Sequence, residues 1–159
     1  MIRLDLTEKR GNNVAFHYED KKFTYAQVAD GANRIGSALH NLGLEQENCV
    51  LICMNDSPEF IMSLLGAMRT NIIPVLLSTM ATAQDYLYYL NDSRAKAIII
   101  DENLVPLILE IKDQAKYLKH LIVRGNPGPG QLSYREITKE ASPDLEADKY
   151  DPTFWRYYC

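Results

Sequence analysis

Thiol and imidazole side chains are the first groups in this 159-residue chain that could support nucleophilic or metal chemistry. Cys49 and Cys53 lie in the segment NCVLICM, where strand geometry would place both on one face. Neither a CxxC spacing nor a nearby histidine supports a metal or redox role, so we expect buried thiols. His17, His40 and His120 are far apart in sequence and form no ligand or triad pattern, so we expect surface or capping roles.

Motifs for cofactor binding or hydrolysis are absent from the sequence, which contains no GxGxxG, Walker, HExxH or GxSxG pattern. We expect the adjacent carboxylates Asp101 and Glu102 to be solvated turn residues. The junction MNDSP has no glycine to admit a pyrophosphate, which argues against a dinucleotide-binding fold. GNPGPG, residues 125–130, lacks a lysine or hydroxyl residue and is predicted to be a surface turn. Residue chemistry therefore assigns no catalytic, cofactor-binding or metal-ligating residue.

The composition is that of an ordinary globular chain, 47% hydrophobic and 24% charged, with a formal net charge of -4. This charge favours neither nucleic acid nor an anionic membrane as a partner. The longest uncharged run, residues 70–84, contains Pro74 and is shorter than the roughly 20 residues needed to span a bilayer. The start, MIRLDLTEKR, has charges where a signal peptide would need an apolar stretch, so a cytoplasmic location is predicted. Three cysteines without paired spacing make a disulfide framework unexpected and agree with that location.

The first half of the chain alternates between strand and helix patterns. Residues 14–25 predict a hairpin that turns at Asp20 and Lys21. A helix begins at Thr24, which has capping-box spacing to Gln27, and ends at Gly43. The strand CVLICM follows, and a second helix has Ser57 as N-cap and Pro58 at its first position. The apolar stripes predicted for the two helices are Val28, Ala32, Ile35, Leu39 and Leu42, and Phe60, Ile61, Leu64, Leu65 and Met68.

The second half continues the alternation with strands at 72–77, 96–100 and 120–124. Between them we expect a helix capped by Thr82 and a helix that extends to Leu118, and after them a short helix with Ser133 and Glu136 in capping-box spacing. The two longer helices turn inward Tyr86, Leu87 and Leu90, and Leu104, Leu107, Ile108, Ile111 and Leu118. Continuous apolar runs fit strands buried on both faces. The sequence thus predicts an α/β fold of three layers, with a mostly parallel sheet and helices on both faces.

Several segments, in collinear order from about Phe16 to Tyr157, resemble the N-terminal part of the adenylate-forming (AMP-binding) acid:CoA ligases, and most closely the benzoate-CoA ligase group. They are the helix start at Thr24, LGL at 42–44, NDSPEF, LGAM, PVLL, YLYYLNDSRAK and DPTFWRY. Their order and spacing carry the resemblance. Asn71 stands where the family usually has glycine, and asparagine can still adopt the left-handed conformation.

The resemblance implies that residues 1–159 form a single incomplete α/β domain, the N-terminal fragment of a larger ligase. In the family a strand similar to TFWRY leads into a Ser/Thr/Gly-rich loop that cradles the ATP phosphates. Tyr158 and Cys159 stand where that loop usually begins, so the chain is expected to end just before it. Phe154, Trp155 and Tyr157 are then expected to pack in an interior. The phosphate loop, acid pocket, metal-coordinating glutamate and C-terminal lysine of the family would all follow Cys159.

The function implied by the resemblance is formation of an acyl-adenylate from a carboxylic acid and ATP, followed by transfer to CoA. An aromatic acid such as benzoate is favoured. ATP, Mg²⁺ and CoA are implied for the full-length protein, whereas the fragment is expected to bind none of them and to be inactive. Its expected partner is the remainder of the ligase chain, or a second copy through the unfinished sheet. The alternative is a non-catalytic shortened paralogue that acts as an interaction module.

Overall fold

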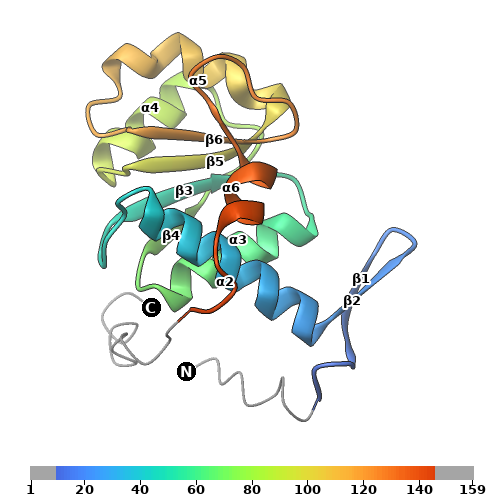
Figure 1. Cartoon of the computed structure of the whole chain (residues 1–159). Coiled ribbons are helices and arrows are strands. Elements are labelled where there is room, and N and C mark those ends of the chain that lie inside the picture. The colour runs from blue at the N-terminus through green and yellow to red at the C-terminus, as the bar shows by residue number, and fades with distance from the viewer. Residues whose placement is uncertain (1–9, 146–159) are drawn as a thin grey trace.

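The structure, a computed structural model, describes residues 10–145, so the aromatic segment at 153–158 lies outside the described residues. β1 (Val14–Tyr18) and β2 (Lys21–Thr24) form an antiparallel hairpin that projects away from the rest of the chain (Figure 1). The hairpin turns one residue earlier than predicted. Lys21 pairs with Tyr18, and Glu19 adopts a left-handed φ of 50° that closes the turn.

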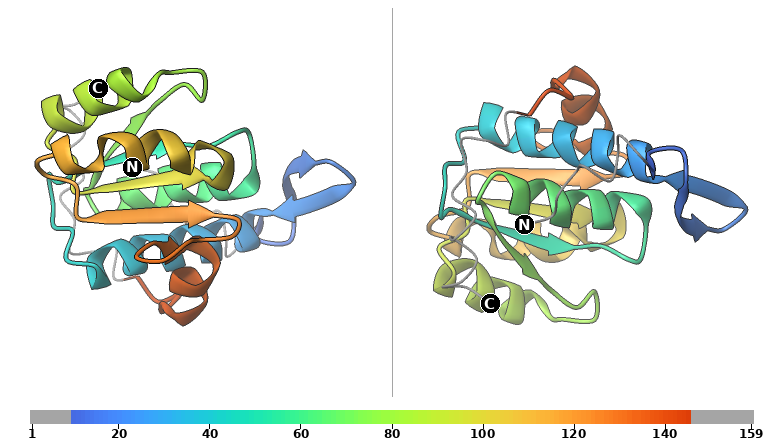
Figure 2. Two further views of the ribbon diagram at one scale, coloured as in Figure 1. Left: turned by 90° about the horizontal axis from the view of Figure 1, so that it is seen from above. Right: turned by 90° about the horizontal axis from the view of Figure 1, so that it is seen from below.

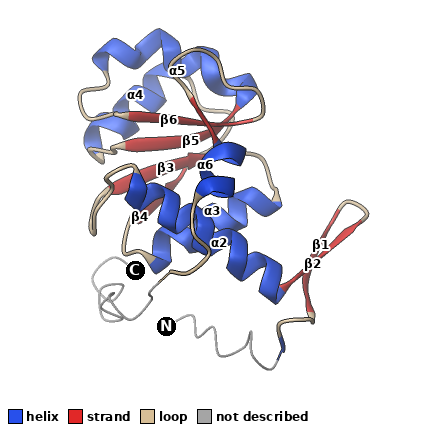
Figure 3. Ribbon diagram, in the orientation of Figure 1, coloured by secondary structure: helices blue, strands red, loops and turns tan. Residues whose placement is uncertain are grey.

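A five-stranded sheet forms the middle layer, in the order β4-β3-β5-β6-β7 (Figure 3). All neighbouring strands are parallel, which confirms the predicted α/β class. The two-residue strand β7 was not predicted, because a run this short leaves no periodicity in the sequence. The strands are β3 (Cys49–Cys53), β4 (Ile73–Leu76), β5 (Ala97–Asp101), β6 (His120–Arg124) and β7 (Leu132–Ser133).

Helices cover both faces of this sheet, as predicted, and Figure 2 shows the two helical layers from opposite sides. One core contains side chains from α2, α3 and α6, and the other contains side chains from α4 and α5. Strand β3 contributes alternate residues to the two cores: Leu51 and Cys53 to one, Val50 and Ile52 to the other. The helices are α2 (Tyr25–Asn41), α3 (Pro58–Arg69), α4 (Ala83–Asp92), α5 (Val105–Ile111) and α6 (Tyr134–Glu140).

The helix starts follow the capping residues read from the sequence. Thr24 Oγ1 accepts a hydrogen bond from the Gln27 backbone N–H, and Gln27 Oε1 accepts one from the Thr24 N–H. Thr82 forms the same reciprocal arrangement with Asp85 at the start of α4. At the start of α3 the Ser57 hydroxyl accepts from the backbone of the third helical residue, as an N-cap serine should.

The apolar stripe predicted for α3 is not the most buried face of this helix. Its buried helical residues include Ser63, Gly66 and Ala67, which are small. The contact with α2 passes over Gly66, where the two backbones approach closely, so small residues occupy the interface. The large apolar residues expected inside are only half-buried: Phe60, Ile61, Leu64, Leu65 and Met68.

The helix predicted to reach Leu118 is shorter than expected. It consists of the 3₁₀ turn η1 (Glu102–Leu104), then α5, and then the 3₁₀ turn η2 (Lys112–Gln114). Ala115 has a non-helical ψ of 87°, which ends the segment before Leu118. Leu118 still packs against the core, because the loop after η2 returns along the sheet. Within residues 10–145, no helix combines the length and the apolar character that crossing a membrane requires.

Candidate functional site at the carboxyl edge of the sheet

The connections of the central strands create a switch in winding direction between β3 and β5. From β3 the chain passes through α3 to β4 on one side, and from β4 it passes through α4 to β5 on the other side. Since α3 and α4 contribute to opposite cores, these two crossovers lie on opposite faces of the sheet. In open α/β sheets, ligands bind outside the carboxyl ends of the strands at such a switch point.

A surface hollow of about 360 Å³ lies next to this point, at the carboxyl ends of β3 and β4. Its walls come from the turn after β3, from the start of α3 and from the segment after β4. Ser78 Oγ accepts a hydrogen bond from the Met80 backbone N–H, so this hydroxyl is held in a local turn. The lining residues are Met54, Asn55, Asp56, Phe60, Leu76, Leu77, Ser78 and Thr79.

Asp101, at the end of β5, connects the segments that meet at the switch point. Its Oδ2 accepts hydrogen bonds from the backbone N–H of Asn55 at 2.9 Å and from Asn55 Nδ2 at 3.0 Å. Its Oδ1 accepts from Arg124 Nε at 2.6 Å. Arg124 Nη1 also lies 3.6 Å from Glu59 Oε2, so one guanidinium connects the ends of β5 and β6 to the first turn of α3.

Asp101 is therefore not the solvated turn residue that its position beside Glu102 suggested. It is only 4% exposed, and a buried carboxylate requires such partners to balance its lost hydration. The hydrogen bond that Arg124 donates to Asp101 raises the pKa of Arg124, so its guanidinium stays charged. Glu102, by contrast, is exposed and accepts from the Asn126 backbone N–H at 2.7 Å, which anchors the exposed turn after β6.

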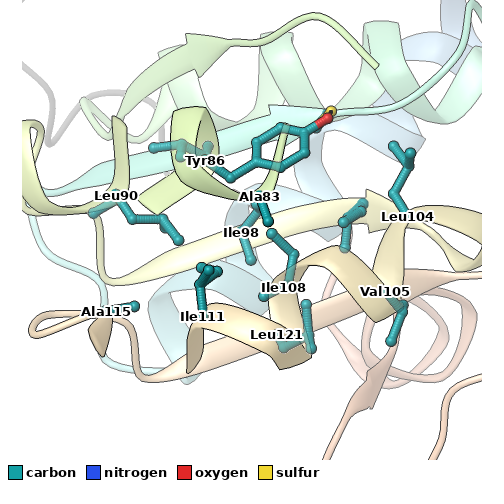
Figure 4. Close-up of a cluster of buried hydrophobic side chains, with 14 of the residues drawn as sticks. Ala83, Tyr86, Leu90, Ile98, Leu104, Val105, Ile108, Ile111, Ala115 and Leu121 are labelled. Atoms are coloured by element: carbon teal, nitrogen blue, oxygen red, sulfur yellow. Dashed lines mark hydrogen bonds between the residues drawn. The ribbon is translucent and has the colours of Figure 1, made fainter. Parts of the chain in front are cut away.

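A second network lies beneath the hollow, in the core shown in Figure 4. Tyr86 Oη donates to the Ser78 carbonyl oxygen at 2.9 Å and lies 3.0 Å from Cys53 Sγ. Burial raises the pKa of Tyr86, with a further contribution from the contact with Cys53. Burial also raises the pKa of the Cys53 thiol, so it remains protonated and a poor nucleophile near neutral pH.

The described residues at this edge therefore shape and rigidify one side of the hollow and supply no free cation to bind a ligand. In the described part of the chain, no lysine or arginine lines the hollow. Arg124 nearby is already paired with Asp101 and Glu59. A triphosphate needs backbone donors and cations to balance its charge, so these residues by themselves do not fit ATP.

The three histidines singled out in the sequence belong to three different elements of the fold. His17 lies in the hairpin, His40 in the last turn of α2 and His120 at the start of β6. Cys53 is buried, whereas Cys49 is half-buried, so full burial was predicted correctly for one of these two thiols. Among residues 10–145 no three His, Cys, Asp or Glu side chains gather in a way that could hold a metal ion.

Asp101 is the residue that sequence reasoning missed at this edge. The only local signal was its place directly after a run of apolar strand residues. Its partners are 46 and 23 positions away, beyond the range of any local motif. The turn before α3 was identified, but its connection to β5 was not.

Comparisons with known proteins extend over almost the whole chain. Residues 5–157 match the family model described as AMP-binding enzyme. The chain is 32% identical to a benzoate–CoA ligase of Thauera aromatica, across 99% of this chain and 30% of that protein. It is also 32% identical to a 4-hydroxybenzoate–CoA/benzoate–CoA ligase of Rhodopseudomonas palustris, across 96% of this chain and 29% of that protein. The chain thus spans about 30% of the length of these relatives.

Solved structures show the same relationship. The anthranilate CoA ligase AuaEII in complex with anthranoyl-AMP superposes with a TM-score of 0.84 and 29% identity, over 89% of this chain and 28% of that one. A benzoate CoA ligase from Burkholderia xenovorans LB400 gives a TM-score of 0.81 and 28% identity, over 92% of this chain and 29% of that one. Together with the family match and the parallel sheet, these similarities show that the chain belongs to the AMP-binding family of adenylate-forming acid:CoA ligases.

Proposed function

We propose that this chain is the N-terminal part of an ATP-dependent carboxylic acid:CoA ligase whose acid substrate is aromatic, of the benzoate type. The observation that carries this proposal is the similarity to two ligases named for benzoate, which extends over 99% and 96% of the chain. The structure named for anthranilate, another aromatic acid, has the same fold over most of the chain. The free thiols Cys49 and Cys53 agree with the cytoplasmic location predicted from the sequence.

Such a ligase converts a carboxylic acid and ATP into an acyl-adenylate and pyrophosphate, and then uses CoA to form acyl-CoA and AMP. In this reaction we assign to residues 10–145 a structural role, which is to position one wall of the hollow. The Asp101 network holds the turn at Asn55 and the first turn of α3 in place, and these form one wall of the hollow. The groups that bind phosphate, metal and acid are assigned to chain beyond Cys159, so the 159 residues alone are inactive.

Two uncovered surfaces of the described residues, the outer edge of β4 and the apolar side of α3, favour the view that the chain is part of a larger fold. Within the described residues, no strand pairs with the outer edge of β4. The large apolar side chains of α3 are half-buried, which leaves apolar area for a further element to cover. The remainder of the ligase chain is the partner that we assign to both surfaces.

Activity assays test this proposal directly. The 159-residue chain, given benzoate, Mg²⁺-ATP and CoA, should form no AMP above background. The gene sequence after codon 159 should continue in frame, and the longer product should prefer benzoate to aliphatic acids. Formation of AMP by the 159-residue chain would contradict the assignment, as would a longer product that prefers aliphatic acids.

The open edge of β4 also favours the second candidate, a non-catalytic interaction module. Ile73 and Leu77 donate their N–H groups to β3, so by alternation Pro74 and Leu76 face outward. Pro74 has no N–H, which leaves Leu76 as the strand's remaining outward donor. Edge pairing is therefore restricted, and we expect apolar contacts to contribute more to any association than backbone pairing does.

Self-association distinguishes this module from a ligase fragment whose missing partner is its own chain. A stop codon after position 159 and concentration-dependent dimers in light scattering would favour the module. Phe154→Ser with Trp155→Ser, in the segment outside the described residues, should then abolish the dimers, whereas Tyr88→Ser on the exposed face of α4 should not. A wild-type chain that stays monomeric at high concentration would exclude this candidate.

A further inference from the structure

A second hollow, of about 550 Å³, lies at the opposite, amino edge of the sheet. Three loops form it, because the amino ends of the adjacent parallel strands β3, β5 and β6 meet at this edge. They are the segments 47–49, 93–96 and 116–119. The size is within the range of small-molecule sites, and the position is remote from the carboxyl edge where the ligase chemistry is proposed.

The charge of this hollow differs from that of the whole chain. Four of its lining residues are cationic, Arg94, Lys96, Lys116 and Lys119, whereas among residues 10–145 Glu47 is the only carboxylate that lines it. The chain as a whole carries a formal charge of -4, so the cationic lining does not reflect overall basicity. None of the four cations belongs to an ion pair within the described residues, where the pairs involve Arg34 and Arg124.

Hydrogen bonds hold the three loops in a defined arrangement. The backbone N–H of Lys96 donates to the Cys49 carbonyl at 3.1 Å, and that of Lys119 donates to the Lys96 carbonyl at 2.8 Å. Asn91 of α4 fixes the third loop, since its Oδ1 accepts from the Lys116 N–H at 2.9 Å and its Nδ2 donates to the Gln114 carbonyl at 3.1 Å. The cationic side chains therefore extend from a backbone that is already in place, and this reduces the entropy lost on binding.

Arg94 has a constrained position at the rim. Its backbone adopts a left-handed φ of 52°, and its guanidinium carbon lies 5.9 Å from the ring centroid of Tyr117. A cation–π contact with an aromatic ring restricts a guanidinium while leaving its N–H groups free to donate. Tyr117 is 41% exposed, so this pair faces solvent at the mouth of the hollow.

We infer that this hollow binds a soluble small molecule that carries two or more phosphate groups. A concave surface lined by cations focuses positive potential and attracts multiply charged anions. Lysines bind phosphate as point charges and arginine as a planar fork, and both types are present. A ligand with a single carboxylate group would leave most of the four cations unpaired. Nucleic acid and anionic membranes fit less well, because the negative charge on the rest of the chain would repel them.

The four cations could instead serve to stabilise the ends of neighbouring helices, and this role predicts a different result on substitution. Arg94 and Lys116 follow the C-terminal ends of α4 and η2, where cations stabilise exposed carbonyl groups. Lys96 and Lys119 directly precede β5 and β6 instead, so this explanation does not cover them. Substitutions in these two pairs can therefore separate binding from stabilisation of the helix ends.

Calorimetric titration of the 159-residue chain with sodium tripolyphosphate tests the inference. We expect one site per chain that weakens as salt is raised. Lys96→Gln with Lys119→Gln, and Arg94→Gln with Lys116→Gln, should each weaken binding by about tenfold or more, since hydrogen bonds to charged groups are lost. Lys21→Gln with Lys22→Gln in the hairpin changes the charge equally and should leave the affinity unchanged.

Three results would overturn the inference. One is the absence of tripolyphosphate binding by the wild-type chain. Another is equal weakening by the hairpin control, which would indicate only a general charge effect. The third is a lower melting temperature for Arg94→Gln with Lys116→Gln at unchanged affinity, which would indicate stabilisation of helix ends. Sedimentation with phosphatidylserine vesicles provides a separate arm, and binding to vesicles without binding to tripolyphosphate would identify a membrane surface instead.

Discussion

Gly66 of α3 packs directly against Gly36 of α2, and neither position has room for a side chain. A Cβ built at Gly66 would lie 3.0 Å from the backbone nitrogen of Gly36, and a Cβ at Gly36 would lie 3.0 Å from the carbonyl oxygen of Gly66. The Cβ at Gly66 would also lie 2.5 Å from the carbonyl oxygen of Ala32 and 2.5 Å from Ile35 Cγ2. The Cβ at Gly36 would also lie 3.0 Å from Thr70 Cγ2. The two carbonyl oxygens belong to the backbone, so they cannot rotate aside. This pair therefore sets how closely the two helices approach, and it explains why small residues occupy the buried face of α3.

Gly66→Ala should destabilise the chain for this reason. Overpacking of a tight contact costs about 1–3 kcal/mol, and an alanine in a helix recovers about 1 kcal/mol of intrinsic propensity. We expect a net loss of up to about 2 kcal/mol in the free energy of unfolding, measured by urea denaturation with circular dichroism. Gly31→Ala in α2 is the matched control, because its Cβ would meet only the flexible side chain of Met62. Equal losses in the two variants would contradict the backbone contact.

Asp101→Asn should weaken the connection between β5, β6 and α3. The substitution removes the charge that pairs with Arg124 and leaves that guanidinium half-buried beside Glu59 alone. We expect a loss of about 2–4 kcal/mol in unfolding free energy, measured from the denaturant midpoint at constant slope. Asp30→Asn breaks an exposed pair with Arg34 within one helix and should cost less than about 1 kcal/mol. A similar loss in both variants would show that the Asp101 network adds nothing.

Tyr86→Phe tests the network beneath the carboxyl-edge hollow. It removes the hydroxyl that donates to the Ser78 carbonyl at 2.9 Å and contacts Cys53 Sγ, while the ring remains. The Ser78 carbonyl then keeps a weak hydrogen bond from Cys53 Sγ at 3.5 Å, so the loss should cost about 1 kcal/mol in thermal or urea unfolding. Tyr88→Phe, on a side chain that is 63% exposed, should have no measurable effect. The prediction fails if both variants have the same unfolding midpoint as the wild type.

Alkaline pH should destabilise the fold through Tyr86 and Tyr134. Burial raises the pKa of both phenols above the ordinary value of 10.0, so the folded state keeps protons that the unfolded state releases. Their contribution is complete below the unfolded pKa and is lost as pH rises through the folded one, so stability should fall from about pH 9 upward. Absorbance at 295 nm should show their ionisation together with unfolding. Tyr86→Phe with Tyr134→Phe should give a shallower decline, and an unchanged slope would refute this assignment.

Local elements of the fold were determined by the sequence itself. The helix starts at Thr24, Ser57 and Thr82 depend on hydrogen bonds to residues three positions away, so their spacing is visible in the chain. The two faces of β3 follow from the alternation that any strand imposes. Asn71, at the position where the family usually has glycine, adopts the left-handed conformation that asparagine allows, with a φ of 54°.

The tertiary structure decided which surfaces of those elements are buried. Nothing local indicates that α3 would bury Gly66 instead of Leu64, because that choice depends on α2 crossing it at Gly36. The burial of Asp101 likewise requires β3, β5 and β6 to lie side by side, so that Asn55 and Arg124 reach one carboxylate from distant positions. Backbone periodicity acts over a few residues, whereas close packing and charge pairing act between whichever surfaces the strand order brings together.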